Sequence, residues 1–388
     1  MTSAVRETPQ THQASGGGSI WSSTTPLRHM VQLDGLRAVA AVMVVLYHFW
    51  RPIREYVHVG AIGVRVFFVL SGFLITGILL RSRALRENGQ TPAGISLRRF
   101  YIRRFLRIFP LYYFALAIAW LGRVSGAREG IIWHAAYLSN VRFFLDNAVH
   151  HGDWGGHVGH FWSLAVEEQF YLLWPWVILF ARRQWLPAIA LGMATVGPVF
   201  RYVVFTQTGN DLTPILPLGC IDSLALGAYL AMTVAPEYAS HRLVRPIGPA
   251  ALWSGLLLLA AYLAAEHTDR FWVFRDVSFD LAIALVGVWL VARAAEGMRG
   301  PAGRVLEFGP LRYLGTISYG IYVYHNMLPE LLTRTARHFG HPDLFAPLGD
   351  QTVSYLIFYG MMSVAVAAVS WHVFEGPINR MKDRFEYR

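Results

Sequence analysis

The chain has 388 residues, of which 54% are hydrophobic and only 15% are charged. A soluble protein of this length carries about 25% charged residues, so the composition excludes an ordinary soluble domain and favours an integral membrane protein. The net charge of +10 comes almost entirely from arginine, since Lys382 is the only lysine. These arginines fall in short stretches between apolar runs, where membrane topology and anionic headgroups explain them better than a nucleic-acid partner does. Cys220 is the only cysteine, which excludes an intramolecular disulfide and a cysteine-based metal cluster.

Residues 1–28 are polar and rich in Ser, Thr and Gly, and we expect them to form a disordered cytoplasmic tail. Beyond them, apolar runs of about 20 residues recur, which is the length that a helix needs to cross a bilayer. The pattern predicts an all-α, polytopic membrane domain over residues 29–378 with about ten transmembrane helices, followed by a basic cytoplasmic tail over residues 379–388. The predicted spans are Val31–Trp50, Val59–Leu80, Phe105–Leu121, Phe161–Phe180, Trp185–Phe205, Leu212–Val234, Pro246–Ala265, Val277–Ala295, Leu311–Leu332 and Val353–Phe374.

Arginine density alternates along the connections between these spans. Seven arginines lie between the second and third spans, whereas the longer connection between the third and fourth spans holds three. Short cytoplasmic loops carry an excess of Arg and Lys. The alternation therefore predicts a multi-pass protein of the cell membrane with both termini in the cytoplasm.

Asp34, Arg37 and His48 lie within the first span, where an ionisable side chain costs free energy and usually faces the protein interior. Arg37 and His48 are three helical turns apart, about 16 Å along the axis, so they share one stripe of the helix. Histidine is the usual general base because its ordinary pKa lies near neutral pH, and we interpret His48 as a base that takes a proton from an acceptor hydroxyl. The alternative is that Asp34 and Arg37 form an interfacial ion pair and that His48 only caps the outer end.

Arg104 and Arg107 stand at the start of the third span and lie near one another on a helix, because they are three residues apart. At the cytoplasmic boundary, their guanidinium forks suit the phosphates of a donor molecule. Anchoring to lipid headgroups is the competing interpretation, and it is the one that we adopt for Arg98 and Arg99.

The fourth span carries two carboxylates, Glu167 and Glu168, which are costly in a bilayer unless they are paired or face a cavity. We expect Glu167 to orient a histidine or to balance an arginine, with a purely structural ion pair as the alternative. Just upstream, residues 150–160 contain four histidines and an aspartate. Their spacing matches no metal-binding motif, so we expect no metal and a flexible outer loop near the site.

Arg201, Asp222 and His325 are further ionisable residues inside predicted spans, and we interpret each of them as a packing partner. A proton-coupled transporter that uses the intramembrane charges as a relay is the alternative from another class of protein. The sequence shows no inverted repeat and no matched pair of spans interrupted by Gly or Pro, and this favours an enzyme over a transporter.

Six short blocks follow one another along the chain. They are Leu33–Arg37 (LDGLR), Gly63–Ile75 (GVRVFFVLSGFLI), Arg104–Tyr112 (RFLRIFPLY), Trp162–Tyr171 (WSLAVEEQFY), Tyr313–His325 (YLGTISYGIYVYH) and Phe374–Pro377 (FEGP). In this order, and over about residues 31 to 380, the chain resembles the acyltransferase-3 family of integral membrane O-acyltransferases. Several blocks in series are far more specific than any one of them.

The resemblance implies a ten-helix membrane domain that uses an acyl-CoA donor, namely acetyl-CoA or another short-chain acyl-CoA. The family's Arg-x10-His pattern falls on Arg37 and His48. Its Arg-x-x-Arg pattern falls on Arg104 and Arg107, in the block that extends to Tyr112. By this resemblance the histidine is essential to transfer, and the arginines serve donor binding or the fold. The expected catalytic residues are therefore His48, Glu167 and Arg37, and the expected donor-binding residues are Arg37, Arg104, Arg107 and Tyr112.

The acceptor expected from the resemblance is a hydroxyl of a small molecule. Members of the family acylate cell-surface polysaccharides, peptidoglycan, lipooligosaccharide signals or macrolide antibiotics. The arginine-rich, lysine-poor composition is similar to that of the macrolide acyltransferases, so a macrolide is the favoured acceptor and antibiotic biosynthesis the favoured role. A sugar of a cell-envelope polysaccharide or glycolipid is the alternative. Many family members carry a soluble esterase-like domain after the last span, and we expect this chain to complete the transfer alone or with a separate partner.

Overall fold

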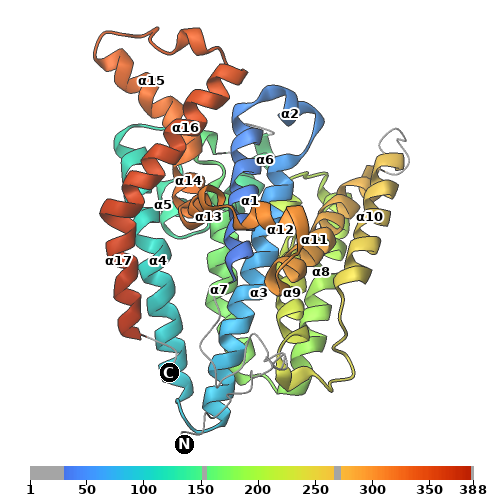
Figure 1. The fold of residues 1–388 in the computed structure, drawn as a ribbon. Coiled ribbons are helices and arrows are strands. Elements are labelled where there is room, and N and C mark those ends of the chain that lie inside the picture. The colour runs from blue at the N-terminus through green and yellow to red at the C-terminus, as the bar shows by residue number, and fades with distance from the viewer. Residues whose placement is uncertain (1–29, 151–154, 266–271, 386–388) are drawn as a thin grey trace, which may run out of the picture.

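In this computed structural model, the structure describes residues 30–150, 155–265 and 272–385, and all the regular elements in these ranges are helices (Figure 1). The predicted all-α fold class is therefore confirmed. The expected disordered tail lies outside the described residues, as do residues 151–154 of the histidine-rich loop and the end of the basic tail, residues 386–388.

Seven described helices are long and apolar enough to cross a membrane, judged by length and composition. Another long helix, α7 (Phe161–Phe180), has the bounds predicted for the fourth span. These helices confirm a polytopic membrane protein, while the number of ten spans stays a prediction. The seven are α1 (Val31–Phe49), α3 (Val59–Glu87), α4 (Ala93–Leu121), α8 (Leu186–Thr208) with the turn before it, α10 (Gly248–Ala265), α11 (Trp272–Glu296) and α16 (Val353–Ser370) with the turns after it.

Two of the predicted spans are divided in the structure. The sixth holds the short helix η3 (Thr213–Ile215) and the 13-residue helix α9 (Ile221–Thr233). Pro214 and Pro217 explain this division, since proline lacks the N–H that a continuing helix needs. The ninth is divided among α13 (Gly309–Thr316), α14 (Ser318–Tyr324), η6 (His325–Met327) and α15 (Leu328–His338). The remaining α-helices are α2 (Arg51–Tyr56), α5 (Ile131–Ala135), α6 (Ser139–His150), α12 (Gly300–Glu307) and α17 (Gly376–Arg380).

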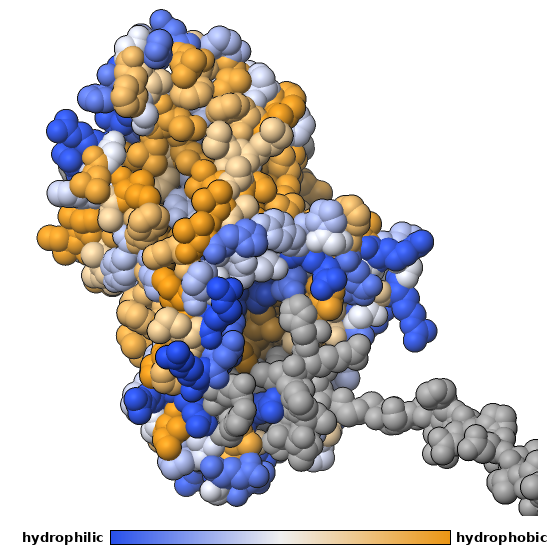
Figure 2. All heavy atoms as spheres, turned by 60° about the vertical axis from the view of Figure 1, so that its left-hand side comes forward, coloured by the Kyte–Doolittle hydropathy of each residue, from blue (hydrophilic) through white to orange (hydrophobic). Residues whose placement is uncertain are grey.

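Large apolar side chains remain exposed along the outer helices. Leu257 on α10 is 72% exposed, Val199 on α8 is 59% exposed, and Leu173 on α7 is 66% exposed. Figure 2 shows the same feature as broad hydrophobic areas on one face of the molecule. In water, a protein with such a surface would aggregate, whereas in a bilayer the surface faces lipid. Helices in a bilayer associate through close packing rather than through the hydrophobic effect.

The contact between α3 and α9 shows this close packing. A Cβ added to Gly72 would lie 2.0 Å from the Leu224 carbonyl oxygen, and one added to Gly227 would lie 2.1 Å from the Val69 carbonyl oxygen. Each glycine therefore lets the backbone of the partner helix approach to a distance that no other residue permits. This contact fixes α3, which contributes one wall of the pocket described below.

A buried charge network joins four helices of the core. Arg65 on α3 donates two hydrogen bonds to Asp280 on α11, at 2.9 and 2.6 Å. Arg201 on α8 pairs with Asp222 on α9 at 2.8 Å, and its Nε lies 3.8 Å from Asp280. The two arginines and two aspartates compensate one another in charge. Arg201 and Asp222 thus form a structural ion pair, consistent with the packing role expected for them.

Candidate active site

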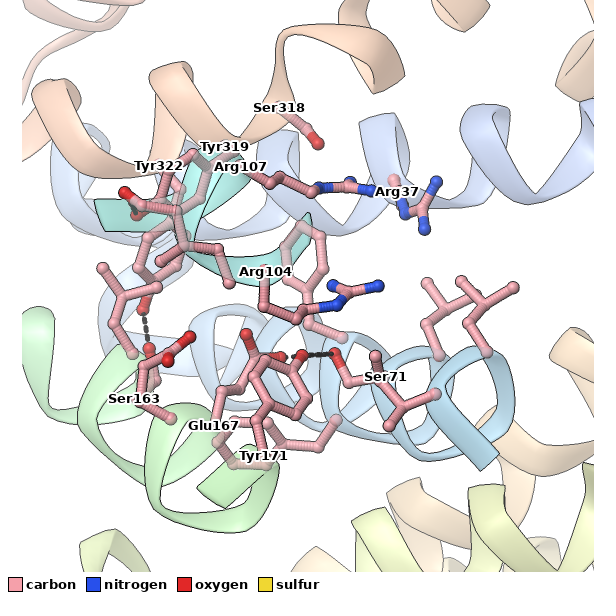
Figure 3. Close-up of a pocket in the computed structure, with 18 of the residues that line it drawn as sticks. Arg37, Ser71, Arg104, Arg107, Ser163, Glu167, Tyr171, Ser318, Tyr319 and Tyr322 are labelled. Atoms are coloured by element: carbon pink, nitrogen blue, oxygen red, sulfur yellow. Dashed lines mark hydrogen bonds between the residues drawn. The ribbon is translucent and has the colours of Figure 1, made fainter. Parts of the chain in front are cut away.

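A pocket with about 880 Å³ of empty space, including its mouth, opens among α1, α3, α4, α7 and α14 (Figure 3). These five helices come from blocks that lie far apart in the sequence, so the pocket exists only in the folded chain. Its lining residues are Arg37, Val64, Phe67, Phe68, Leu70, Ser71, Leu74, Ile75, Arg104, Arg107, Ile108, Ser163, Leu164, Glu167, Glu168, Tyr171, Ser318, Tyr319 and Tyr322.

Three guanidinium groups gather on one side of this pocket, those of Arg37, Arg104 and Arg107 (Figure 3). Arg37 Nη1 donates to Asp34 Oδ1 at 2.9 Å, which is the ion pair of the alternative interpretation. The guanidinium of Arg104 lies over the Tyr171 ring, 5.5 Å from its centroid. Within the described part of the chain, the Arg107 guanidinium has no hydrogen bond or ion pair. The structure therefore brings together three of the expected donor-binding residues, with positive charge available for an anion.

A chain of hydroxyl groups holds the carboxylate of Glu167 on another wall of the pocket. Ser71 Oγ donates to Glu167 Oε1 at 2.5 Å, and Tyr171 OH donates to Ser71 Oγ at 2.9 Å. Among the described residues, Glu167 makes no hydrogen bond to a histidine. The described residues therefore show no hydrogen bond by which Glu167 would orient a histidine. Its other expected role, the balance of arginine charge, fits a pocket that three arginines line.

His48 lies near the end of α1 that leads into α2, in a cluster with His160 and His325. The ring centroids of His48 and His325 are 4.8 Å apart, and those of His160 and His325 are 4.7 Å apart. His48 is not among the described residues that line the pocket, but Tyr322 lines it and belongs to the segment that holds His325. The expected base is therefore adjacent to the arginine pocket rather than inside it.

Two backbone carbonyls determine which nitrogens of this cluster carry protons. His325 Nδ1 lies 2.7 Å from the Tyr322 carbonyl oxygen and must donate to it, which leaves His325 Nε2 as an acceptor. His48 Nδ1 lies 2.8 Å from the Val44 carbonyl oxygen and 3.2 Å from His325 Nε2, so its proton is shared between these two acceptors. In the neutral ring, Nε2 of His48 then has no proton and is free to accept one.

Several residues take positions that the sequence did not indicate. His325, expected as a packing partner, contacts His48 directly. Tyr112, expected in donor binding, is fully buried and donates to the His134 carbonyl oxygen at 2.8 Å; it is not among the described residues that line the pocket. Ser71, Tyr171 and Tyr322 were not predicted, because hydroxyl groups in an apolar run carry no charge signal.

The fold and the site define a polytopic membrane protein in which a pocket lined by three arginines adjoins a cluster of three histidines. A family model described as an acyltransferase domain matches residues 30–372, and the chain therefore belongs to the acyltransferase-3 family. This membership favours the enzyme expected from the sequence over the transporter alternative. No solved structure matches the chain.

The curated relatives are similar over most of this chain. Peptidoglycan O-acetyltransferase OatA of Listeria monocytogenes is 28% identical over 377 residues, which are 91% of this chain and 56% of the relative. YrhL of Bacillus subtilis is 27% identical over 384 residues, 92% of this chain and 56% of the relative. O-acetyltransferase OatA of Staphylococcus aureus is 24% identical over 373 residues, 91% of this chain and 58% of the relative. The chain thus spans a little over half the length of these relatives.

Proposed function

We propose that this membrane O-acyltransferase moves an acetyl or other short acyl group from acyl-CoA to a sugar hydroxyl of a cell-envelope glycan. The observation that carries the proposal is the junction of two sites: a pocket with three arginines adjoins a histidine cluster in which one ring nitrogen is free to accept a proton. The first suits a polyanionic donor. The second suits the deprotonation of an alcohol.

Acyl transfer by this arrangement needs no nucleophile from the protein. His48 Nε2 takes the proton of the acceptor hydroxyl while the hydroxyl oxygen forms a bond to the thioester carbonyl carbon. The carbon–sulfur bond then breaks, and the thiolate of CoA leaves with the proton that His48 returns. The buried thiol of Cys220 plays no part. Its Sγ donates a hydrogen bond to the Leu216 carbonyl oxygen, and Cys220 is not among the described residues that line the pocket.

Arg107→Ala is expected to weaken acetyl-CoA binding and to leave the protein folded, because the guanidinium that it removes has no protein partner in the described residues. One charge-assisted hydrogen bond contributes about 1.5–3 kcal/mol, so the dissociation constant should rise roughly 10- to 150-fold. Arg107→Lys should restore only part of the affinity, since lysine is a point charge rather than a planar fork. Calorimetric titration of the purified protein with CoA measures the effect.

Arg98→Ala is the matched control for this titration. Arg98 lies on the same helix α4, but it is exposed and is not among the described residues that line the pocket. Its loss should leave CoA affinity unchanged. Equal affinities of the Arg107→Ala and Arg98→Ala proteins would reduce Arg107 to a topology signal and would contradict the proposed donor site.

The relatives favour a glycan acceptor over the macrolide that the composition suggested. The printed names of all three relatives described above contain O-acetyltransferase, and those of the Listeria and Bacillus relatives specify peptidoglycan. Competition decides between the acceptors: membranes that contain the protein are incubated with labelled acetyl-CoA, peptidoglycan fragments and a macrolide. We expect label on the glycan. Label on the macrolide alone would reverse the assignment of the acceptor.

The arginine distribution supports a cytoplasmic turn between α3 and α4. The described C-terminal residues belong to the same side in this proposal, because Arg103 Nη1 donates to the Lys382 carbonyl oxygen at 2.9 Å. Single cysteines in a Cys220→Ala background test this orientation. Asn88→Cys lies beside that turn, and His341→Cys follows α15 at the other end of the molecule; both positions are exposed. A membrane-impermeant maleimide should label only His341→Cys in intact cells. Labelling of Asn88→Cys alone would contradict this orientation and would place the turn between α3 and α4 outside the cell.

A further inference from the structure

Two hydroxyl groups meet in the wall of the pocket on the side opposite the guanidinium groups (Figure 3). Ser163 on α7 and Tyr322 on α14 both line the pocket and are 4% and 6% exposed. The Ser163 Oγ and Tyr322 OH atoms are 2.5 Å apart. A donor whose phosphates lie at the arginines would extend its far end towards this hydroxyl pair.

Tyr322 also connects the pocket to the histidine cluster. Its backbone carbonyl oxygen accepts the proton of His325 Nδ1, and the centroid of its ring lies 5.8 Å from that of His325. His325 in turn contacts His48 through the 3.2 Å hydrogen bond. The hydroxyl pair is therefore at the point where a thioester from the arginine side and a base from the histidine side would meet.

The protons of the pair can be redirected to a new acceptor. Both oxygens lie near the His160 carbonyl oxygen, Ser163 Oγ at 3.2 Å and Tyr322 OH at 3.1 Å. Either hydroxyl can donate to the other while the second donates to this carbonyl. One proton can therefore turn to a third oxygen in the pocket while the other hydroxyl keeps its bond to the His160 carbonyl. Such a pair is already oriented for an oxygen on which negative charge develops.

We propose that one hydroxyl of the Ser163–Tyr322 pair, held in place by the other, donates a hydrogen bond to the acyl carbonyl oxygen of the donor and stabilises the oxyanion of the tetrahedral intermediate. When the acceptor oxygen bonds to the carbonyl carbon, the π electrons of the C=O bond move to this oxygen, which the hydroxyl pair then holds. The C=O bond is restored as the carbon–sulfur bond breaks and the thiolate leaves. The inference deepens the proposed acyl transfer and rests on it.

Tyr322→Phe tests this role because it removes the hydroxyl and keeps the ring. Removing one oxyanion donor lowers kcat by about 10²- to 10³-fold, and we expect a loss of this order with the dissociation constant for CoA unchanged. Ser163→Ala should also lower kcat. Because the two hydroxyls act as a unit, the loss in the double variant should be smaller than the product of the two single losses.

Tyr324→Phe is the matched control. Tyr324 lies two residues further along the chain, at the end of the same helix, and its hydroxyl bonds to Ser370 Oγ at 3.2 Å, so that this substitution also removes one interhelical hydrogen bond. Tyr324 is not among the described residues that line the pocket. The control should melt at nearly the same temperature as Tyr322→Phe and should keep its kcat.

Three outcomes overturn the inference. A folded Tyr322→Phe protein with the kcat of Tyr324→Phe would reduce the pair to a structural tie between helices. A rise in KM alone would make it a binding contact. If Tyr322→Phe does not fold, the decision falls to Ser163→Ala, whose full kcat would have the same meaning. Absence of transfer by the unmodified protein would instead remove the proposed function itself, so the two failures are distinguishable.

Discussion

His48→Ala should reduce acyl transfer by about 10²- to 10⁴-fold, the usual cost of removing a positioned general base, while expression and CoA binding remain normal. The reason is the direction of the hydrogen bonds at its ring: Nδ1 is occupied by the Val44 carbonyl oxygen and His325 Nε2, and Nε2 is left as the proton acceptor. CoA binding should persist because Arg37 lies about three turns away along α1, and Arg104 and Arg107 lie on another helix, α4. Single-turnover transfer from labelled acetyl-CoA, with CoA titrations in parallel, measures both quantities.

His58→Ala provides the control for this variant. His58 precedes α3 beyond the end of α1 and is exposed, and it is not part of the histidine cluster. It should keep full activity. If His48→Ala retains nearly full turnover while His325→Ala loses it, the base is His325, and the roles of the two rings are reversed.

Asp280→Ala should destabilise the protein by about 3–5 kcal/mol, the usual cost of breaking a buried ion pair by removing one partner. Asp280 accepts two hydrogen bonds from Arg65 and lies 3.8 Å from Arg201 Nε, and the side chains of the Arg65–Asp280 pair are 3% and 8% exposed. Its loss leaves a positive charge uncompensated in the core. Denaturant unfolding of the purified protein in detergent measures the free energy of unfolding.

Two further variants make this stability test specific. Glu55→Ala removes an ion pair with Arg51 whose side chains are 53% and 69% exposed, and such surface pairs contribute at most about 1 kcal/mol. The double variant Arg65→Met/Asp280→Leu should recover part of the lost stability, because it removes the second charge as well. An Asp280→Ala protein as stable as Glu55→Ala would contradict the structural role of the buried network.

The sequence predicts the parts of this site that carry a charge in an apolar run. Arg37, Arg104 and Arg107 are found in this way. A charged side chain inside a membrane span costs free energy, and its presence therefore indicates a functional role. Arg65 and Asp280 carry the same signal, but their pairing across 215 residues is visible only in the fold. Helix α7 was predicted to the residue, because its apolar run is bounded on both sides by polar residues.

The unpredicted features depend on contacts between distant segments. The ninth predicted span reads as one apolar run, yet it is divided near His325, and this division brings His325 to His48. The expected partner of Glu167 is a histidine or an arginine, whereas its hydrogen-bond partner in the fold is Ser71 from α3. Hydroxyl groups such as those of Ser163 and Tyr322 fit an apolar helix at little cost, so nothing in the sequence distinguishes them from packing residues.

We propose that this chain transfers an acyl group directly from acyl-CoA to a hydroxyl, with His48 as the base. The most direct measurement is a single-turnover reaction of the purified protein in lipid vesicles, with isotope-labelled acetyl-CoA and peptidoglycan fragments as acceptor, followed by mass spectrometry. We expect one labelled O-acetyl ester on the glycan for each CoA released, with both products formed about 10²- to 10⁴-fold more slowly by the His48→Ala protein. Ester formation at equal rates by both proteins, or CoA release without an ester, would contradict the account.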